Sequence, residues 1–471
     1  MSSTTSGSVP AHVPTPTPVP AAITVAAAPA RPANLLYGLD DRPPPAALLL
    51  LGLQHVAVMS LGLIVAVMMA NAAHASFDEA GMLVRLCMLA MGIATCLQGV
   101  RRYGIGAGYL CPSISGPAYI AAGMAACAAG GVALLSGMLL LVGVFEICLS
   151  RVLTRLRALF PPHVIGVVVL MVGFEVVLVS VPRFMGQHAA GSAAQRCSLA
   201  VAVLALVGMV IPTVWGKGRI RLYSMLIGLG LGYAAAAVWG LFGAEARTAL
   251  ARMPWFALPR PGHFGWSLDA ALIVPFLVAT LSSTLKGIGD LSLCQKINDP
   301  NWRAPDFKPI SGGVLALGIG NLLAGVSGGL GMSSSSSNVG LSLSLGATSR
   351  VVLFSLGGQL ILLSFLPKVA GVFVLMPEPV MGACLVYATS YMLTAGFQIL
   401  CAQPLRMHAV FVVGVALCFS LSFDLVPGLY AGMPGWLSPL FQNSLTLATL
   451  LAVVLNLILR PAAAEAIRPP A

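Results

Sequence analysis

Charged residues are scarce in this chain. Only 8% of its 471 residues are Asp, Glu, Lys or Arg, whereas 58% are hydrophobic. Soluble domains carry about 25% charged residues, which keep their surfaces in contact with water. A chain with so little charge cannot cover a water-facing surface, so a soluble globular fold is excluded. The composition indicates an integral membrane protein.

Metal-ligand spacing is also missing from the sequence. The ten cysteines stand singly inside apolar stretches, as at Cys87, Cys148 and Cys418, which is typical of small buried hydrophobic side chains. No nucleophile–base pair is visible either. These absences disfavour a membrane-embedded enzyme, and we expect neither a metal ion nor a cofactor.

Acidic residues are fewer than basic ones, 14 against 25, which gives a net charge of +11. The basic residues do not gather in one patch, so nucleic-acid binding is not indicated. They fall between apolar runs, where Lys and Arg report the topology. With a cytoplasmic N-terminus, the loops on that side hold the larger share of them, including Arg101, Arg151 and Arg350, against Arg183 and Arg247 opposite. Both termini are therefore expected in the cytoplasm.

The two ends of the chain differ from its middle. Residues 1–43 are rich in Pro, Ala, Ser and Thr, which predicts a disordered cytoplasmic tail. This stretch lacks the basic start and apolar core of a secretory signal. Residues 461–471 form a short second tail, which leaves one membrane domain over 44–460. Short loops and the absence of a targeting segment favour a bacterial inner membrane.

Long apolar runs supply fourteen candidate membrane spans, each of which needs roughly 20 mostly apolar residues. The third and tenth spans are interrupted by Gly, Pro or Ser. The runs cover residues 46–70, 82–99, 105–126, 131–149, 164–181, 198–215, 222–242, 268–288, 312–326, 329–347, 350–368, 379–400, 407–424 and 444–459.

Two short motifs recur along the chain. GYLCPSIS begins at Gly108 and GGLGMSSS at Gly328, with a glycine, a leucine and two serines matching at one offset. PPHVIG from Pro161 and PEPVMG from Pro377 both read Pro-x-x-Val-x-Gly. The pairs keep their order and nearly their spacing, which predicts two halves of seven spans. Because seven is odd, the halves lie in opposite orientation, as in transporters whose site lies at the interrupted segments.

The interrupted segments have their own chemistry. Non-helical backbone at membrane depth is tolerated only where protein or water surrounds it. GAGYLCPSISGPAYI and GGLGMSSSSSNVGLSL each predict a short extended piece that leads into a half-helix. Ser and Asn cap helix starts, and the partial positive charge there suits an acidic or hydrogen-bonding solute. We therefore place the candidate site here, with a small-residue packing interface as the alternative.

Ionisable and polar side chains inside the spans form a second set of candidates. They are Gln54 and His55 in the first span, Glu175 in the fifth, and Lys286 and Asp290 in the eighth. The last two are four residues apart and share a helical face. A plain ion pair, a snorkelling lysine, a structural carboxylate and a satisfied interior histidine remain the alternatives. Arg85 and Glu146 lie near predicted span ends and are expected at the membrane interface.

These motifs resemble the nucleobase–ascorbate transporter family, which includes xanthine, uracil and urate permeases, over residues 45–460. LQH at 53–55, KGIGD at 286–290 and SNVGLSLSLGATSR at 337–350 resemble the family's motifs in spans 1, 8 and 10. FPPHVIG and PEPVMG resemble the starts of its spans 5 and 12. The resemblance implies an all-α polytopic membrane protein of 14 spans in two inverted repeats, with short extended pieces in spans 3 and 10. It also implies a core domain of spans 1–4 and 8–11 that moves against a gate domain of spans 5–7 and 12–14, usually in a homodimer.

The chain departs from the family at informative positions. Ser337 stands where the signature has Gln or Glu, and Lys286 stands where the family has a substrate-binding Glu. A carboxylate accepts hydrogen bonds and a lysine only donates them, so the site is expected to be donor-rich and positive. This favours an anionic or acceptor-rich solute, such as urate or deprotonated xanthine. It also keeps open a small-anion transporter on the same seven-plus-seven fold, as in sulfate and bicarbonate carriers.

The sequence therefore predicts a secondary active transporter of nucleobase-type solutes, of the xanthine, urate or uracil class. A channel is disfavoured by the two matched broken segments. The family implies coupling to protons or sodium, and because two usual carboxylates are missing, the coupling candidates are His55, Glu175 and Asp290. The predicted substrate-binding residues are Gln54, His55, Ser113, Ser115, Tyr119, Lys286, Asp290, Ser335, Ser336, Ser337 and Asn338.

Overall fold

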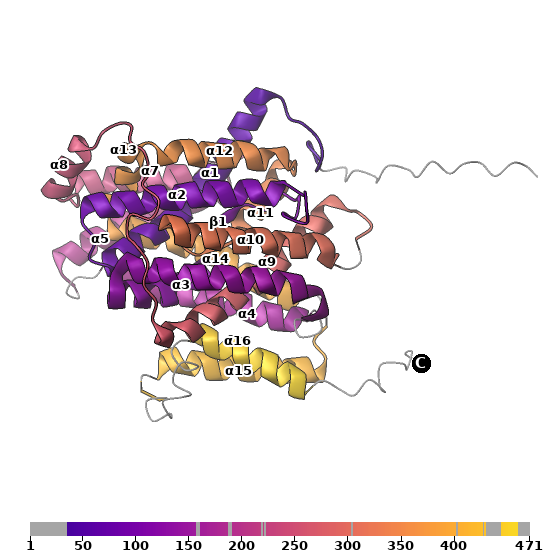
Figure 1. Cartoon of the computed structure of the whole chain (residues 1–471). Coiled ribbons are helices and arrows are strands. Elements are labelled where there is room, and N and C mark those ends of the chain that lie inside the picture. Colours follow the sequence, from indigo (N-terminus) through magenta and orange to yellow (C-terminus); the bar gives the residue numbers. More distant parts are fainter. Residues whose placement is uncertain are drawn as a thin grey trace, which may run out of the picture.

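The computed structural model shows a bundle of helices that run roughly side by side (Figure 1). It describes residues 35–156, 161–186, 191–217, 220, 223–302, 305–401, 404–426, 428–429 and 444–459. Of the predicted N-terminal tail, residues 1–34 lie outside the described residues, as does the whole predicted C-terminal tail. Residues 35–41 run beside the link between two helices of the second half, where Leu36 N–H donates to Gly346 O over 2.6 Å.

The first half of the described chain holds seven helices, a short strand and a 3-10 turn. They are α1 (Pro45–Ala72), α2 (Phe77–Gly99), β1 (Ser113–Ser115), η1 (Pro117–Tyr119), α3 (Ile120–Leu156), α4 (Pro162–Met185), α5 (Ala193–Val214), α7 (Ser224–Val238) and α8 (Ala244–Arg252). α3 contains non-helical backbone at Gly130 and Gly131, where the fourth predicted span begins.

The second half repeats much of this order. Its elements are η3 (Ala270–Leu272), α9 (Ile273–Asn298), α10 (Phe307–Ser327), β2 (Met332–Ser334), α11 (Ser336–Leu345), α12 (Val351–Ser364), α13 (Pro367–Val374), α14 (Glu378–Leu400), α15 (Met407–Leu425) and α16 (Ser444–Ile458). Each of the fourteen predicted intervals overlaps at least one of these elements.

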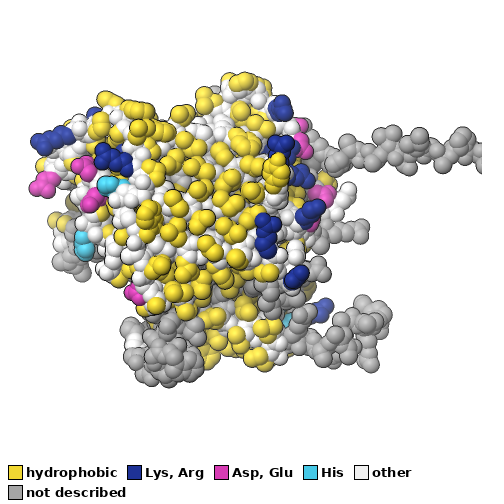
Figure 2. Space-filling model, in the orientation of Figure 1, with side chains coloured by type: hydrophobic (Ala, Val, Ile, Leu, Met, Phe, Trp, Pro, Cys, Tyr) yellow, Lys and Arg dark blue, Asp and Glu magenta, His cyan; other side chains and the backbone are white. Residues whose placement is uncertain are grey.

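Fewer helices than fourteen are long enough to cross a membrane unaided. By length and composition, nine helices in the described part of the chain qualify, or ten if α12 and α13, bent by 87°, count as one span. Figure 2 shows a wide belt of hydrophobic side chains on the visible face, with Lys and Arg gathered toward its two ends. The chain is thus a helical membrane protein, while the count of fourteen spans stays a prediction.

The recurring Pro-x-x-Val-x-Gly motif has a structural reason. Its two copies begin α4 and α14, which pack closely against each other and run in opposite directions. A Cβ at Gly166 would lie 2.6 Å from Leu400 Cγ, and one at Gly382 would lie 2.3 Å from the backbone nitrogen of Phe184. Each glycine therefore lets the start of one helix approach the end of the other.

Helix contacts fall into two groups. In one, α2 packs against α12 and α10, α3 against α10, and α1 against α12. In the other, α4 packs against α14 and α16, α5 against α7, and α15 against α16. Fewer contacts join the two groups, chiefly those of α9 with α4 and α16. The interrupted segments lie within the first group and face the second.

Candidate functional site

The two interrupted segments meet in the middle of the molecule as an antiparallel pair of short strands. β1 and β2 place Ser113 opposite Ser334, Ile114 opposite Ser333, and Ser115 opposite Met332. All residues of both strands are buried. The main-chain hydrogen bonds between the strands satisfy backbone groups that would otherwise be unpaired in an apolar interior.

This strand pair is symmetric with respect to the sequence repeat. At the offset of the repeat, Ser113 corresponds to Ser333 and Ile114 corresponds to Ser334. When each residue is exchanged for its counterpart, the pair Ser113–Ser334 becomes the pair Ile114–Ser333, and the structure contains both pairs. The pair Ser115–Met332 has Ser335 and Pro112 as its counterpart. These two residues are also in contact, because Ser335 N–H donates to Pro112 O over 3.0 Å. The segments matched by sequence therefore face each other directly.

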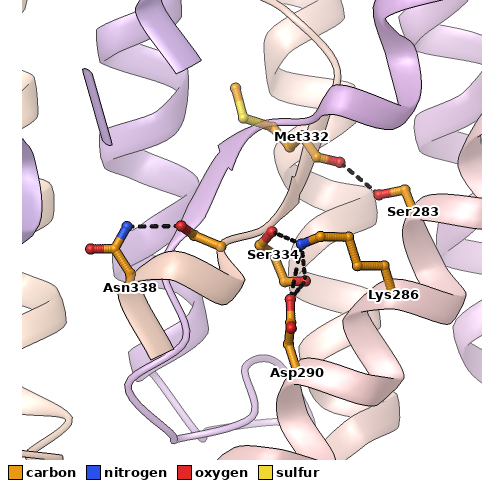
Figure 3. A network of polar contacts seen from close by, with 7 residues as sticks. Ser283, Lys286, Asp290, Met332, Ser334 and Asn338 are labelled. Atoms are coloured by element: carbon orange, nitrogen blue, oxygen red, sulfur yellow. Dashed lines mark hydrogen bonds and ion pairs between the residues drawn. The ribbon is translucent and has the colours of Figure 1, made fainter. Parts of the chain in front are cut away.

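A buried ion pair lies beside β2. Lys286 Nζ on α9 lies 3.0 Å from Asp290 Oδ2 and donates to the backbone oxygen of Ser334 over 2.5 Å. The Ser334 hydroxyl donates to the same Asp290 oxygen. Figure 3 shows Lys286 and Ser334 pointing toward each other, with Asp290 below them on the same helix as Lys286. Lys286 and Asp290 are only 3% and 7% exposed, so each charge is neutralised by the other rather than by water.

His55 on α1 is held by the start of α11. Its Nδ1 lies 2.7 Å from Asn338 Oδ1, and Asn338 Nδ2 donates to Ser335 Oγ over 2.8 Å. Since the Asn338 nitrogen is occupied as a donor to Ser335, its oxygen faces His55, and Nδ1 carries the proton in the neutral ring. The other ring nitrogen, Nε2, is then an acceptor.

A cavity of ≈ 50 Å³ lies between the strands, α9 and the helices of the second group. Its polar lining comes from Ser115, Lys286 and the four serines Ser334, Ser335, Ser336 and Ser337. Its apolar side includes Val176 of α4 and Leu385, Ala388 and Met392 of α14. Gln54, His55, Ser113, Tyr119, Asp290 and Asn338 do not line it, although Asp290 and Asn338 bind residues that do.

A second, larger cavity of ≈ 220 Å³ adjoins the first, since Leu61, Ser336, Ser337 and Ala388 line both. Polar groups on its far side belong to Thr213, Ser224 and Tyr387, whose hydroxyl lies 2.9 Å from Thr213 Oγ1 and 3.4 Å from Ser224 Oγ. The two cavities therefore adjoin each other between the strands and the end of α5 and the start of α7.

Several buried polar atoms around the strands have no hydrogen-bond partner within the described protein. They are Gln54 Oε1, His55 Nε2, Ser113 Oγ and Ser333 Oγ. Buried polar groups of native proteins are nearly always paired, so a concentration of unpaired ones points to a bound solute or water. Three of these four residues, Gln54, His55 and Ser113, were singled out by the sequence.

Tyr119 belongs to a different network, behind the strands. Its hydroxyl donates to Thr280 and accepts from Asn321 Nδ2, over 3.3 Å in each case. The same Asn321 nitrogen donates to Glu146 Oε2 over 2.6 Å, and Thr284 donates to Glu146 Oε1 over 2.9 Å. Glu146 has no exposed surface.

Glu146 and Arg85 were expected near span ends at the membrane interface, and the structure buries both side chains inside the protein. α3 continues to Leu156 and α2 begins at Phe77, so neither residue lies at a helix end. Arg85 is 5% exposed and donates to the backbone oxygens of Ser364 and Ala257. Apolar runs mark the extent of hydropathy, and both helices extend beyond their runs.

Glu175 lies on the other side of the cavity, next to the lining residue Val176. It is 5% exposed and faces the backbone N–H of Leu445 at the start of α16, without a hydrogen bond of normal geometry to the described protein. No arginine pairs with it among the described residues.

Sequence reasoning missed Asn321, Thr284 and Ser334. Asn321 is a lone amide in the apolar run of α10, which by itself is a signal for a buried polar contact. Thr284 shares α9 with Lys286. Ser334 differed from its neighbours in the serine run only by its place in the strand, which the sequence does not reveal.

Two broken segments that meet beside a small polar cavity, inside a bundle of apolar helices, define a membrane transporter. Solved structures share this fold: the transmembrane domain of the cyanobacterial bicarbonate transporter BicA (TM-score 0.52, 13% identity, 89% of this chain and 99% of that one), and the murine anion transporter Slc26a9 in its inward-facing state (TM-score 0.57, 12% identity, 89% and 69%). At such low identity these likenesses show the fold alone.

The chain belongs to the permease family of the xanthine/uracil type, whose model matches residues 46–429. Among its relatives is the xanthine permease XanP of Escherichia coli K12, which is 28% identical over 448 residues, covering 91% of this chain and 95% of XanP. The protein is accordingly a transporter and not an enzyme.

Proposed function

We propose that this permease carries a nucleobase-type solute, of the xanthine, urate or uracil class, across the membrane. The carrying observation is the polar side of the central cavity, which is lined by serine hydroxyls and Lys286. Gln54 and His55 lie outside this lining and carry unpaired acceptor atoms, and His55 is joined to the lining residue Ser335 through Asn338. Hydroxyls both donate and accept, and Gln54 Oε1 and His55 Nε2 accept. A planar heterocycle with alternating N–H and C=O groups matches such a set.

The state of Lys286 bears on the charge of the solute. On sequence alone this lysine made the site positive, but Asp290 lies 3.0 Å away and cancels its charge. A neutral site has little electrostatic preference for an anion, whereas its donors and acceptors remain available to a neutral base. The relationship to XanP points the same way.

A small inorganic or organic anion remains the second candidate. Lys286 lines the cavity, and α11, a helix of ten residues, begins there and directs its partial positive charge toward it. The two structural neighbours are named as bicarbonate and anion transporters. These features favour an anion only if the Lys286–Asp290 pair opens.

We propose an elevator-like movement, in which a core of α1–α3 and α9–α12 moves against a gate of α4, α5, α7 and α14–α16. Dense packing within each group and sparse contact between them support this division. All polar residues that line the central cavity belong to the core, while the gate contributes Val176, Leu385, Ala388 and Met392, which are apolar. A moving core would therefore take the polar lining of the central cavity with it, past the apolar residues that the gate contributes there.

The proposal includes two inverted seven-span repeats, for which the symmetric strand pair is the strongest support. It also includes a homodimer, a bacterial inner membrane and cytoplasmic termini. With the basic loops in the cytoplasm, the second cavity opens toward that side, because it extends to Thr213, four residues before Lys217.

Uptake by purified protein in liposomes tests the solute class. Radiolabelled xanthine, uracil and urate would be compared with bicarbonate and sulfate, using protein-free liposomes as the control. We expect saturable uptake of at least one base, competed by other bases and unaffected by inorganic anions. Anion uptake without any response to bases would replace the first candidate by the second.

A further inference from the structure

Of the coupling candidates predicted from the sequence, Glu175 is a buried carboxyl whose oxygens have no hydrogen-bond partner in the described protein, so nothing there holds a proton in place. Asp290 is tied to Lys286 and Ser334, and His55 to Asn338. Glu146 differs from all three, because it is fully buried, forms no ion pair in the described part of the chain and accepts hydrogen bonds at both carboxylate oxygens. A buried carboxyl without a cation is the group most ready to bind a proton.

We propose that Glu146 is the site at which this transporter binds its coupling proton, which rests on the proposed function as a transporter of bases. One proton from water adds to a carboxylate oxygen of Glu146 when the site faces one side, and returns to water on the other. No other bond forms or breaks. The coupling site is thereby separate from the solute-binding groups, since Glu146 lines neither cavity.

The two partners of Glu146 suit a reversible proton. Thr284 donates to Oε1, and its hydroxyl can rotate to accept from a protonated carboxyl. Asn321 cannot rotate in this way, because its Oδ1 accepts the backbone N–H of Met332 over 2.6 Å and so fixes its nitrogen toward Glu146. One partner adapts while the other holds the carboxyl in place, so both protonation states are hydrogen-bonded without moving the backbone.

The same geometry argues against a sodium ion at this position. A sodium ion needs several oxygen ligands, whereas the amide of Asn321 presents its hydrogens to Glu146, to the Tyr119 hydroxyl and to the Met332 oxygen. The positively polarised N–H groups occupy the place that a cation would take. Among the described residues, no group of three His, Cys, Asp or Glu side chains could hold a metal ion.

Glu146 is linked to the solute site through β2. Asn321 binds Met332 at both its N–H and its carbonyl, and Ser283 donates to the same carbonyl over 3.3 Å. Two residues further on, Ser334 lines the cavity and accepts from Lys286. A change in the charge of Glu146 therefore acts on the strand that forms one wall of the solute site.

Other titratable groups lie on the elements that pack against α3. They are Tyr119 on η1, His55 on α1, Lys286, Asp290 and Lys296 on α9, Lys308 at the exposed start of α10, and Asp269 before η3. Of these, only Tyr119 shares a partner with Glu146, through Asn321. An ionised Glu146 would therefore leave a negative charge in this buried network, and protonation would make the network neutral, which lowers the cost of moving it through an apolar surrounding.

The test compares Glu146→Gln with wild type in liposomes under an imposed pH gradient. We expect wild type to accumulate the labelled base and Glu146→Gln to lose at least tenfold of this accumulation, while exchange of labelled for unlabelled base continues. Glu245→Gln, the same change at an exposed position on α8, is the matched control and should behave as wild type. Gradient-driven accumulation that persists in Glu146→Gln would overturn the proposal. The proposal would also be overturned if Glu175→Gln lost this accumulation while Glu146→Gln kept it.

A second variant keeps the proposal testable if Glu146→Gln does not fold. Thr284→Val removes the hydroxyl but keeps the shape of the side chain. Ionised Glu146 then loses a charge-assisted hydrogen bond, whereas protonated Glu146 loses a weaker one. Protonation becomes easier, and the pH of half-maximal uptake should rise by roughly half a unit to one unit. An unchanged pH profile would contradict the proposal.

The failures remain distinguishable. A wild-type protein that neither takes up nor exchanges any base contradicts the proposed function. A wild-type protein that exchanges bases but ignores the pH gradient, or responds only to a sodium gradient, contradicts the proton site alone.

Discussion

Replacing Lys286 by methionine tests the buried ion pair most directly. At 3.0 Å and an effective dielectric constant of about 20, the attraction between Lys286 and Asp290 is about 5–6 kcal/mol. Methionine fills the space of the lysine stem but leaves Asp290 with only the Ser334 hydroxyl. Because the carboxylate stays buried, Lys286→Met should reduce the free energy of unfolding by about 3–5 kcal/mol.

A double-mutant cycle separates the pair from its surroundings. Asp290→Asn removes the other charge, and Lys286→Met with Asp290→Asn removes both. Denaturant titration of the purified protein in micelles measures all four forms. We expect the double variant to be more stable than the sum of the single losses predicts, by about 1–3 kcal/mol. Losses that add to within about 0.5 kcal/mol would refute the pair as a coupled unit.

The same variants examine the charge of the site. Lys286→Met leaves one negative charge beside the cavity, and Asp290→Asn leaves one positive charge. A unit charge about 6 Å from a bound anion contributes about 3 kcal/mol at this dielectric constant, which is roughly a hundredfold in affinity. Competition by urate against uracil should therefore weaken in the first variant and strengthen in the second. Equal competition in both would show that the pair lies out of reach of the solute.

Three further predictions concern assembly of the site and its movement. Gly331→Ala should destabilise the protein by about 1–3 kcal/mol and reduce uptake, because the new Cβ would lie 2.5 Å from Tyr119 Cγ. The matched control is Gly358→Ala, because open space surrounds that position. Equal stability of the two variants would contradict this packing. The hydroxyl oxygens of Ser282 on α9 and Thr449 on α16 lie 3.0 Å apart. A double variant with Ser282→Cys and Thr449→Cys should therefore form a disulfide on oxidation, lose uptake and regain it with reductant, and the single variants serve as controls. Uptake by the cross-linked protein would exclude movement between the two helix groups at this contact. Asn338→Leu leaves His55 Nδ1 without its acceptor and should lower the free energy of unfolding by about 1–3 kcal/mol in denaturant titration. Its control is Ser390→Ala, at an exposed position on α14. A loss of stability no larger than that of the control would argue against the His55–Asn338 hydrogen bond.

The interrupted segments could be predicted from the sequence because they break two strong rules at once. Serine, glycine and proline occur where apolar helix is expected, and they recur at one offset, from Gly108 and from Gly328. The antiparallel pairing of β1 and β2 is the pairing that two halves in opposite orientation would give. The partner of each residue does not, because Ser113 pairs with Ser334 and not with its repeat equivalent Ser333.

Side-chain partners were less accessible to sequence reasoning. The spacing of Lys286 and Asp290 was enough to keep an ion pair among the alternatives, since residues four apart share a helical face, but it did not decide between the pair and a substrate-binding lysine. Glu146 and Asn321 are 175 residues apart in the sequence and lie on different helices, so no local sequence pattern predicts their contact. Hydropathy also placed Glu146 at a span end, because it reports where apolar residues stop and not where the helix does.

The central strand pair separates the shape of the binding site from its chemistry. Its register is held by main-chain hydrogen bonds, which every residue except proline can make, so the serines Ser333 and Ser334 do not determine the backbone that presents them. Substitutions that keep the size of these buried side chains would leave this frame in place, and a run of serines offers hydroxyls that reorient between donor and acceptor. Such a frame allows one transporter architecture to acquire new solutes through point substitutions alone.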